Sequence, residues 1–446
     1  MGWLSSLRAR LSGMGVASLG GILGGVAGGI AGGILVVLVT LVLKAGMDYA
    51  AGQPTWFIIV VPLLGLAVAT LVLHGLGTLA TPPGAGQKPH PWRAFPPGAL
   101  RADISGDVVD TAGEEERFPW RLAPIRALAI VATVGSGGAM GTEAPAAYLG
   151  VATGVCLGDR GQRWRRFLRP AAVAGGAAGV GALMGIALVG TAFMLELGRR
   201  RNAPLSPERV IAALVGGFIG WGIDAMFGLS LIRLVVPKEA PASFLQAVIT
   251  ALFIGALAGG VSSLAGLAVN QAKKWKASPI ARLLIGGAAS AVIALVLARI
   301  ASRPAGVGPG GGAILWAETV AATPLALLAV CVLRAAATTA AVAAGGCGGV
   351  FVPFLAVGDL AGRVFAPGLG IGNDLAGAAG AAGGISGGYR LPFTAAFMVL
   401  GVGGPPKATL VCMATVVVAS AAGDGVERLL AKLKELLAAR RRAPAH

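Results

Sequence analysis

The sequence predicts an all-α polytopic membrane protein made of two inverted-topology repeats with broken, tilted helices. Two observations support this prediction: an apolar composition and a repeated pattern of glycine and proline. Of the 446 residues, 56% are hydrophobic and only 12% are charged, whereas a soluble domain has about 25% charged residues. These charges are too few to cover a surface that faces water, so we expect most of the surface to face lipid.

Apolar runs occur along almost the whole chain, and one membrane-spanning helix needs about 20 such residues. We expect spans within residues 15–43, 55–80, 124–157, 170–197, 210–236, 243–270, 279–300, 313–343, 345–368, 375–402 and 405–422. Several runs exceed the length of one span, so we expect some of them to hold two short or tilted helices. The first run is too long for a cleavable signal peptide and other apolar runs follow it, so we expect it to span the membrane.

Basic residues cluster beside the predicted spans and give the chain a net charge of +17. The clusters are Arg163, Arg165, Arg166 and Arg169; Arg199 to Arg201; Lys273, Lys274 and Lys276; and Arg440 to Arg442. Lysine and arginine at span ends mark cytoplasmic loops, so we expect an integral protein of the inner cell membrane with both termini in the cytoplasm. This placement favours contact with anionic lipid and argues against nucleic acid as a partner.

Polar segments divide the chain into four regions. We expect a cytoplasmic N-terminal segment at 1–14, a first membrane half at 15–209, a second at 210–425, and a cytoplasmic basic helix and tail at 426–446. The first half contains a proline-rich polar loop at 82–119, whose role the sequence leaves open. The spacing of leucine, lysine and arginine from Val426 to Arg442 predicts an amphipathic helix on the inner membrane surface.

Two pairs of similar segments indicate the repeat. Residues 175–195 and 378–400 both begin with small residues and contain the core Ala-Phe-Met. A glycine-containing segment that ends in proline precedes each copy, at 141–145 and at 348–353. In transporters, Gly/Pro-interrupted segments at matching positions of two halves indicate the binding site.

Glycine is abundant, with 72 residues, and many lie four apart, as at Gly21, Gly25 and Gly29. Small residues at this spacing let helices approach closely in lipid. We therefore expect most glycines to serve helix packing. We expect a role in function only for those that precede a proline at the start of an apolar run.

Those two segments have the form that a membrane anion site requires. A helix that begins at membrane depth leaves its first N–H groups without partners and directs the positive end of its dipole into the protein. Such a helix start binds anions. Glycine lets the backbone approach the ion, and proline fits the first turn, where no N–H is needed. We expect helix starts of this kind near Pro145 and Pro353.

Glu143 is the only carboxylate between Leu122 and Leu157, and a carboxylate at membrane depth indicates function. At a helix start it would compete with an anion for the same amides. Burial favours the protonated carboxyl, whereas the helix end favours the charged one, so this group could take up a proton, swing out and act as a gate. The alternative is a helix N-cap or lumen-facing carboxylate without a transport role.

The remaining reactive residues give no sign of a metal, a cofactor or an enzyme. The four cysteines all lie inside apolar runs, where packing is their expected role. The three histidines are not grouped with cysteines or carboxylates, and no cluster of histidine, aspartate or serine occurs in the spans.

The two proline motifs resemble those of the CLC family of chloride channels and proton-coupled chloride antiporters. Residues 141–145, Gly-Thr-Glu-Ala-Pro, resemble the family motif G-R/K-E-G-P, and residues 349–353, Gly-Val-Phe-Val-Pro, match G-x-F-x-P. The segments 122–126 and 193–197 resemble the entry to the helix before the gate and the end of the helix that closes the first half. The similarity extends over about residues 15–435.

This resemblance implies a set of roles. Glu143 would be the gate and part of the proton path, and the amides of Val350 and Phe351 would contact the central anion. Gly141, Thr142, Ala144 and Gly349 would complete the anion-binding motifs. The family implies transport of chloride or a similar anion, possibly with protons, by antiport or passive conductance, and a homodimer with one pore per subunit and no cofactor. A transporter of another solute on an inverted-repeat fold is the alternative.

Several positions depart from the family pattern. The motif G-S-G-I-P, whose serine contacts the anion, has its nearest match at 84–89, with Ala85 in place of the serine. The pore tyrosine aligns near Val426. Leu197, one residue after Glu196, occupies the position at which the antiporters of the family have an internal glutamate for proton transfer. Whether Glu196 or Glu318 takes part in proton transfer stays open, since either can instead serve a helix end.

Overall fold

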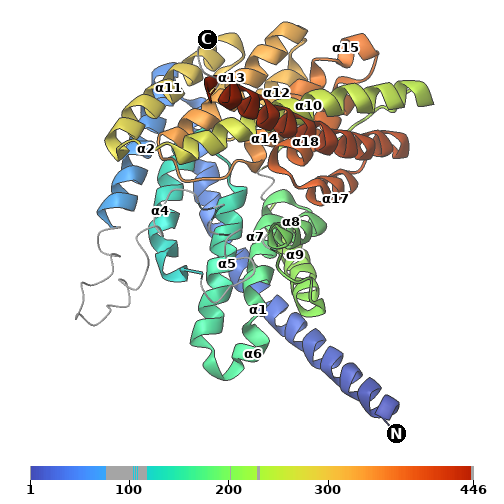
Figure 1. The fold of residues 1–446 in the computed structure, drawn as a ribbon. Helices are drawn as coiled ribbons and strands as arrows, with labels where there is room; N and C mark the ends of the chain where they lie inside the picture. Colours follow the sequence, from blue (N-terminus) through green and yellow to red (C-terminus); the bar gives the residue numbers. More distant parts are fainter. Residues whose placement is uncertain are drawn as a thin grey trace. The chain divides into compact units, whose positions relative to one another are not determined.

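The chain is all-α in a computed structural model that describes residues 2–76, 118–200, 202–228 and 232–442, with Ile104, Gly106 and Val108 (Figure 1). Within these residues no β-strand occurs, and the one isolated β-bridge joins Gly141 to Gly349. The predicted fold class is therefore confirmed. Residues 77–103, which hold Ala85 and most of the predicted loop 82–119, lie outside the described residues.

The chain divides into two compact units, each described here by itself. The first unit comprises residues 1–233, 272–312 and 337–353. Its helices are α1 (Gly2–Gly52), α2 (Thr55–Gly75), α4 (Ala123–Val134), α5 (Glu143–Arg160), α6 (Arg165–Leu168), α7 (Ala171–Met184), α8 (Ala187–Arg199), α9 (Pro207–Phe227) and α11 (Pro279–Ile300), with short 3₁₀ turns η3 (Trp120–Leu122), η4 (Gln162–Trp164) and η5 (Arg303–Gly306).

The second unit comprises residues 234–271, 313–336 and 354–446. Its helices are α10 (Phe244–Lys274), α12 (Gly311–Thr319), α13 (Pro324–Ala343), α14 (Phe351–Arg363), α15 (Ala366–Leu369), α16 (Asn373–Gly384), α17 (Pro392–Val402) and α18 (Pro406–Arg442), with a π-helical turn η6 at Ile385–Tyr389. Helices α10, α12, α13 and α14 have residues in both units, and the first three residues of α14 belong to the first unit.

Seven of the described helices are long and apolar enough to cross a membrane. They are α1 over Ser18–Gly52, α2, α9, α10, α11, α13 and α18 over Pro406–Leu436. Their outward faces carry large apolar side chains, such as Leu38 and Leu71, which are 57% and 71% exposed. An apolar surface of this extent requires lipid as its solvent, which confirms an integral, multi-pass membrane protein.

Four predicted runs each hold two helices, as expected from their length. Run 124–157 contains α4 and α5, run 170–197 contains α7 and α8, run 313–343 contains α12 and α13, and run 375–402 contains α16 and α17. The breaks have local causes: α7 ends at Gly185, with φ 65°, and α17 begins after Arg390, with φ 62°. A left-handed residue ends a helix, and proline at the first turn of α17 starts the next.

The two chain ends differ from expectation in one respect. Helix α1 begins at Gly2, so no helix boundary separates residues 1–14 from the first span. Helix α18 continues from Pro406 to Arg442, so the predicted amphipathic helix from Val426 is the second part of one long helix. Sequence patterns place a boundary where polarity changes, but backbone hydrogen bonding continues through such a change because lysine and arginine are good helix formers.

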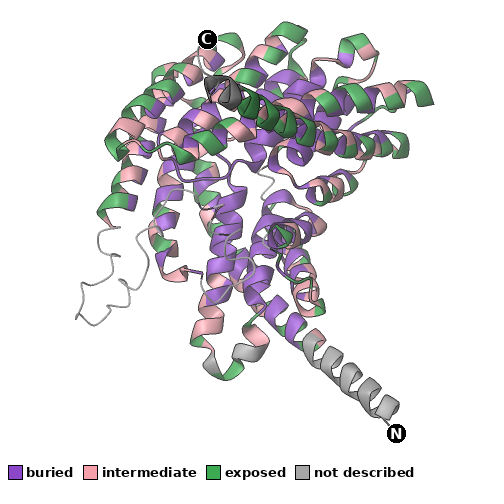
Figure 2. Ribbon diagram, viewed as in Figure 1, coloured by how far each residue is buried: buried purple, intermediate pink, exposed green. Residues whose placement is uncertain are grey.

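Glycines let α1 lie against two neighbours inside the first unit. Gly21, Gly25 and Gly29 face α9, and Gly28 faces the backbone of Ala171 at the start of α7. Helix α7 is buried at every residue from Ala171 to Met184, and Figure 2 shows the burial of α5 and α7 in purple. The predicted role of the four-residue glycine spacing in packing is confirmed, because backbones this close leave no room for side chains.

We predict that Gly28→Ala destabilises the protein, whereas Gly52→Ala on the same helix does not. A Cβ atom at Gly28 would lie 2.8 Å from the carbonyl carbon and Cα of Ala171, whereas nothing lies within 4 Å of one at Gly52. Overpacking of this kind costs about 1–3 kcal/mol. Thermal unfolding in detergent measures the difference, and equal midpoints for the two variants would contradict this packing.

Candidate anion-binding site

The two glycine motifs meet in the first unit. The amide of Gly141 donates to the carbonyl of Gly349 at 2.7 Å, and the amide of Gly349 donates to the carbonyl of Gly141 at 2.8 Å. This pair of hydrogen bonds joins two loops that lie far apart in the sequence. Each loop leads directly into a helix, so the bridge holds two helix starts beside each other.

Both helix starts are buried. Helix α5 begins at Glu143 with Thr142 as its N-cap residue, and α14 begins at Phe351. Thr142, Glu143 and Ala144 are buried, as are Val350 and Phe351. The first amides of a helix have no partner within it, so a buried helix start needs partners from elsewhere in the protein. The sequence prediction of helix starts inside the apolar runs at Pro145 and Pro353 matches this arrangement.

The Glu143 side chain reaches across to the start of α14. Its carboxylate is fully buried, and Oε1 accepts a hydrogen bond from the Phe351 amide at 2.6 Å. The backbone amides of Thr142, Val352 and Glu143 itself also stabilise the negative charge of this carboxylate. Oε2 has no hydrogen-bond partner among the described residues. The Thr142 side chain does not cap α5, so this carboxylate contacts the other helix of the pair and occupies the position that α14 offers to an anion.

Two aromatic rings pack against each other at the start of α14. Phe193 of α8 meets Phe351 edge to face, with ring centroids 5.8 Å apart, and both side chains are almost fully buried. A charge in such surroundings interacts more strongly with amide dipoles than it would in water. The site can therefore hold one desolvated negative charge, whether that charge belongs to Glu143 or to a small anion.

Two side chains outside the motifs hold the end of α13 and the loop that follows it into α14. Arg282 of α11 donates from Nε to the carbonyl of Ala343 at 2.9 Å and from Nη2 to that of Val342 at 3.0 Å. Thr133 of α4 accepts from the Cys347 amide at 3.1 Å. Sequence reasoning missed both residues: Arg282 resembles a basic residue at a span end, and Thr133 resembles a packing residue inside an apolar run.

The other predicted site residues lie elsewhere in the chain. Val426 is half-buried in α18 of the second unit. Glu196 is half-buried three residues before the end of α8, and Leu197 is buried next to it. Ala85 falls outside the described residues.

Glu318 belongs to a charged group of the second unit. Its Oε1 lies 3.7 Å from Nη2 of Arg363, which forms a closer pair with Asp359. The Asp359 and Arg363 side chains are fully buried and joined by hydrogen bonds of 2.7 and 3.1 Å. Glu318 therefore serves an ion-pair network around α14.

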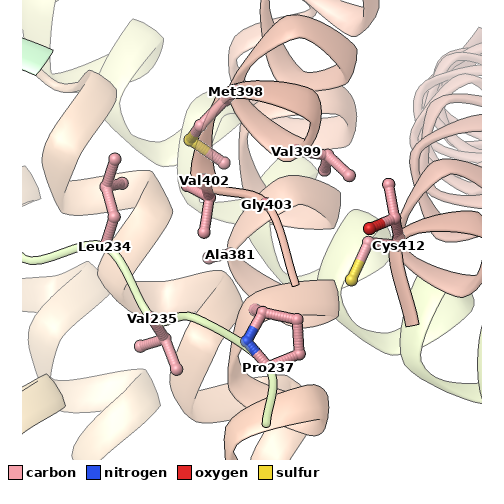
Figure 3. Close-up of a pocket in the computed structure, with 11 residues that line it drawn as sticks. Leu234, Val235, Pro237, Ala381, Met398, Val399, Val402, Gly403 and Cys412 are labelled. Atoms are coloured by element: carbon pink, nitrogen blue, oxygen red, sulfur yellow. The ribbon is translucent and has the colours of Figure 1, made fainter. Parts of the chain in front are cut away.

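An apolar pocket in the second unit offers no charge to an anion (Figure 3). Leu234, Pro237, Met398, Val399 and Cys412 are among the residues that line it. Within the described residues, no three histidine, cysteine, aspartate or glutamate side chains gather as a metal site requires. The contact between Glu143 and Phe351, in contrast, presents the first amide of a helix to a negative charge, as an anion site requires.

Comparison with known proteins agrees with this geometry. Residues 101–424 match the family model of the voltage gated chloride channel. The voltage-gated ClC-type chloride channel ClcB of Escherichia coli O9:H4 (strain HS) is 24% identical over 339 residues, which cover 73% of this chain and 72% of that protein.

Three solved structures share the fold. A slow cyanobacterial Cl⁻/H⁺ antiporter superposes with a TM-score of 0.67 at 19% identity, covering 94% of this chain and 98% of that one. A CLC-type fluoride/proton antiporter gives 0.63 at 20% identity, covering 92% and 95%. A eukaryotic CLC transporter gives 0.62 at 17% identity, covering 94% of this chain and 73% of that one.

We predict that Thr133→Val weakens the loop before α14, because valine keeps the shape but lacks the hydroxyl that accepts from the Cys347 amide. Loss of an acceptor for a buried donor costs about 1–3 kcal/mol. Thr133→Ser keeps the hydroxyl and is the matched control. Thermal unfolding should show a lower midpoint for the valine variant alone; a loss of equal size in both variants would mean that the threonine methyl, not the hydroxyl, matters.

Proposed function

Because this chain belongs to the voltage-gated chloride channel family, whose members include the CLC antiporters, we propose that Glu143 is the gate of its anion pathway. The chain carries chloride or a similar small anion across the membrane, as a proton-coupled antiporter or a passive channel. The observation that supports the gate is the hydrogen bond from the Phe351 amide to the buried Glu143 carboxylate. This contact places a removable negative charge on the amide that an anion needs.

The gate works by competition for one helix start. With Glu143 ionised and seated, its charge occupies the first amide of α14 and repels an approaching anion. Protonation removes that charge and weakens the hydrogen bond, because a bond to a charged group is worth roughly twice a neutral one. The neutral side chain then leaves, and an anion takes the amides of Val350 and Phe351. The positive end of the α14 dipole stabilises either occupant.

Backbone groups supply most of the proposed anion site. In this proposal Gly141, Thr142 and Ala144 of the first motif and Gly349 of the second contribute to the anion site. Ala85 and Val426 align in sequence with the positions where the family has hydroxyl donors. Methyl and isopropyl groups cannot donate a hydrogen bond. The selectivity of this pathway therefore depends on amide dipoles and on the size of the space they enclose.

Proton coupling would use a path that differs from the family pattern. Leu197 cannot hold a proton, so we propose Glu196, its half-buried neighbour, as the internal proton carrier if coupling occurs. If a chloride gradient drives protons uphill in liposomes, the protein is an antiporter. If chloride moves without protons, it is a passive channel.

We further propose that the protein is a homodimer with one pathway per subunit, built from the halves 15–209 and 210–425, in the inner cell membrane. Both termini are cytoplasmic in this proposal. The basic groups at Arg199 and Arg200 and at Lys273 and Lys274 support the orientation, since each lies at the end of an apolar helix.

We predict that Glu143→Gln abolishes the pH dependence of anion flux in liposomes. Wild-type flux should rise as the pH falls, because the carboxyl takes up a proton and leaves the Phe351 amide. Glutamine does not ionise, so the flux of that variant should be almost constant over roughly pH 4 to 8, the range in which carboxyl groups titrate. Asp48→Asn, which removes an exposed carboxylate, is the control and should keep the wild-type profile. A pH profile unchanged in Glu143→Gln would contradict the gate.

A further inference from the structure

We propose that Gly141 and Gly349 form a seat for the Glu143 carboxylate, and that the lack of a side chain at both positions is what lets this pathway close. The inference rests on the proposed gate and extends it, because closure then depends on two glycines, which do not titrate, as well as on Glu143. The seat consists of the two bridged glycines and the Phe351 amide.

The space beside each glycine is filled by the carboxylate. A Cβ atom at Gly141 would lie 2.6 Å from Oε1 and 2.7 Å from Cδ of Glu143, and closer still to Oε2. At Gly349 it would lie 2.6 Å from Cδ, closer still to Oε1, and 3.0 Å from the backbone nitrogen of Ala144. Real Cβ atoms essentially never approach other heavy atoms within 3.0 Å. A methyl group at either position and a seated carboxylate therefore exclude each other.

The carboxylate is the part that would move. It is the end of a flexible side chain, whereas the two glycines are held by reciprocal backbone hydrogen bonds of 2.7 and 2.8 Å. At Gly141 the three nearest atoms all belong to the Glu143 carboxyl group. Neither glycine has a positive φ, so alanine meets no strain from the backbone dihedral angles there.

This arrangement contrasts with that of the packing glycines. At Gly28 and Gly190 a methyl group would meet backbone atoms of α7, which cannot leave without separating helices. At Gly141 it would meet a side chain that the gate already moves. The same substitution should thus destabilise the fold at the packing positions and open the pathway at the seat.

Chloride efflux from liposomes tests the seat. We expect Gly141→Ala to raise efflux at neutral pH and to lose the wild-type pH dependence, as Glu143→Ala does. The double variant Gly141→Ala/Glu143→Ala should match Glu143→Ala within about twofold, because two changes that remove one interaction do not add. Gly222→Ala, with nothing within 4 Å of the added methyl, is the matched control and should behave as wild type.

The outcomes separate the seat from the gate. Wild-type efflux and pH dependence in both Gly141→Ala and Gly349→Ala, together with altered transport in Glu143→Ala, would overturn the seat and leave the gate intact. Wild-type behaviour in Glu143→Ala would instead overturn the gate itself.

Folding gives a second readout. If Gly141→Ala does not give a monodisperse protein but the double variant does, the methyl group conflicts with the carboxylate, as proposed. If the double variant also fails to fold, the conflict is with the backbone, and the seat is wrong.

Discussion

The hydrogen bond from the Phe351 amide to the Glu143 carboxylate joins the starts of two helices, α14 and α5, that are distant in the sequence. Its geometry depends on the bridge between Gly141 and Gly349, which holds both loops in place. Thr133 accepts a hydrogen bond from the Cys347 amide in the loop before α14, and Arg282 holds the last residues of α13, which lead into that loop. The Phe351 amide is therefore positioned by the loop before α14 and is paired with the charge of Glu143.

The proposed gate requires that the contact between Glu143 and the Phe351 amide can break. Removing an ion from water costs several kcal/mol even after the protein relaxes, whereas a hydrogen bond to a charged group returns about 1.5–3 kcal/mol. The helix start adds up to about 2 kcal/mol in buried geometry. One oxygen of the carboxylate has no hydrogen bond among the described residues, although neighbouring amides also stabilise its charge. In the proposed gate, a proton removes this charge and an anion then takes the place of the carboxylate.

The sequence indicated the membrane fold and the helix starts, because both follow from local properties. Apolar runs that exceed one span predicted the paired helices. Glycine and proline in each motif predicted helix starts near Pro145 and Pro353, two residues after the observed starts at Glu143 and Phe351. The contact between Glu143 and Phe351 could not be derived in this way, since nothing local relates two residues this far apart; only the family resemblance brought the motifs together. Thr133 and Arg282 were missed for the same reason. The continuity of α1 and α18 at the chain ends was also missed, because a change of polarity does not end a helix.

The central claim is that the Phe351 amide binds either the Glu143 carboxylate or the transported anion. Crystals of the Glu143→Gln variant grown in bromide test it most directly, because bromide scatters anomalously and marks its own position. The account predicts an anomalous peak within hydrogen-bonding distance of the Phe351 amide, with the glutamine side chain turned away. A glutamine that remains on that amide, with bromide bound elsewhere or absent, would contradict it.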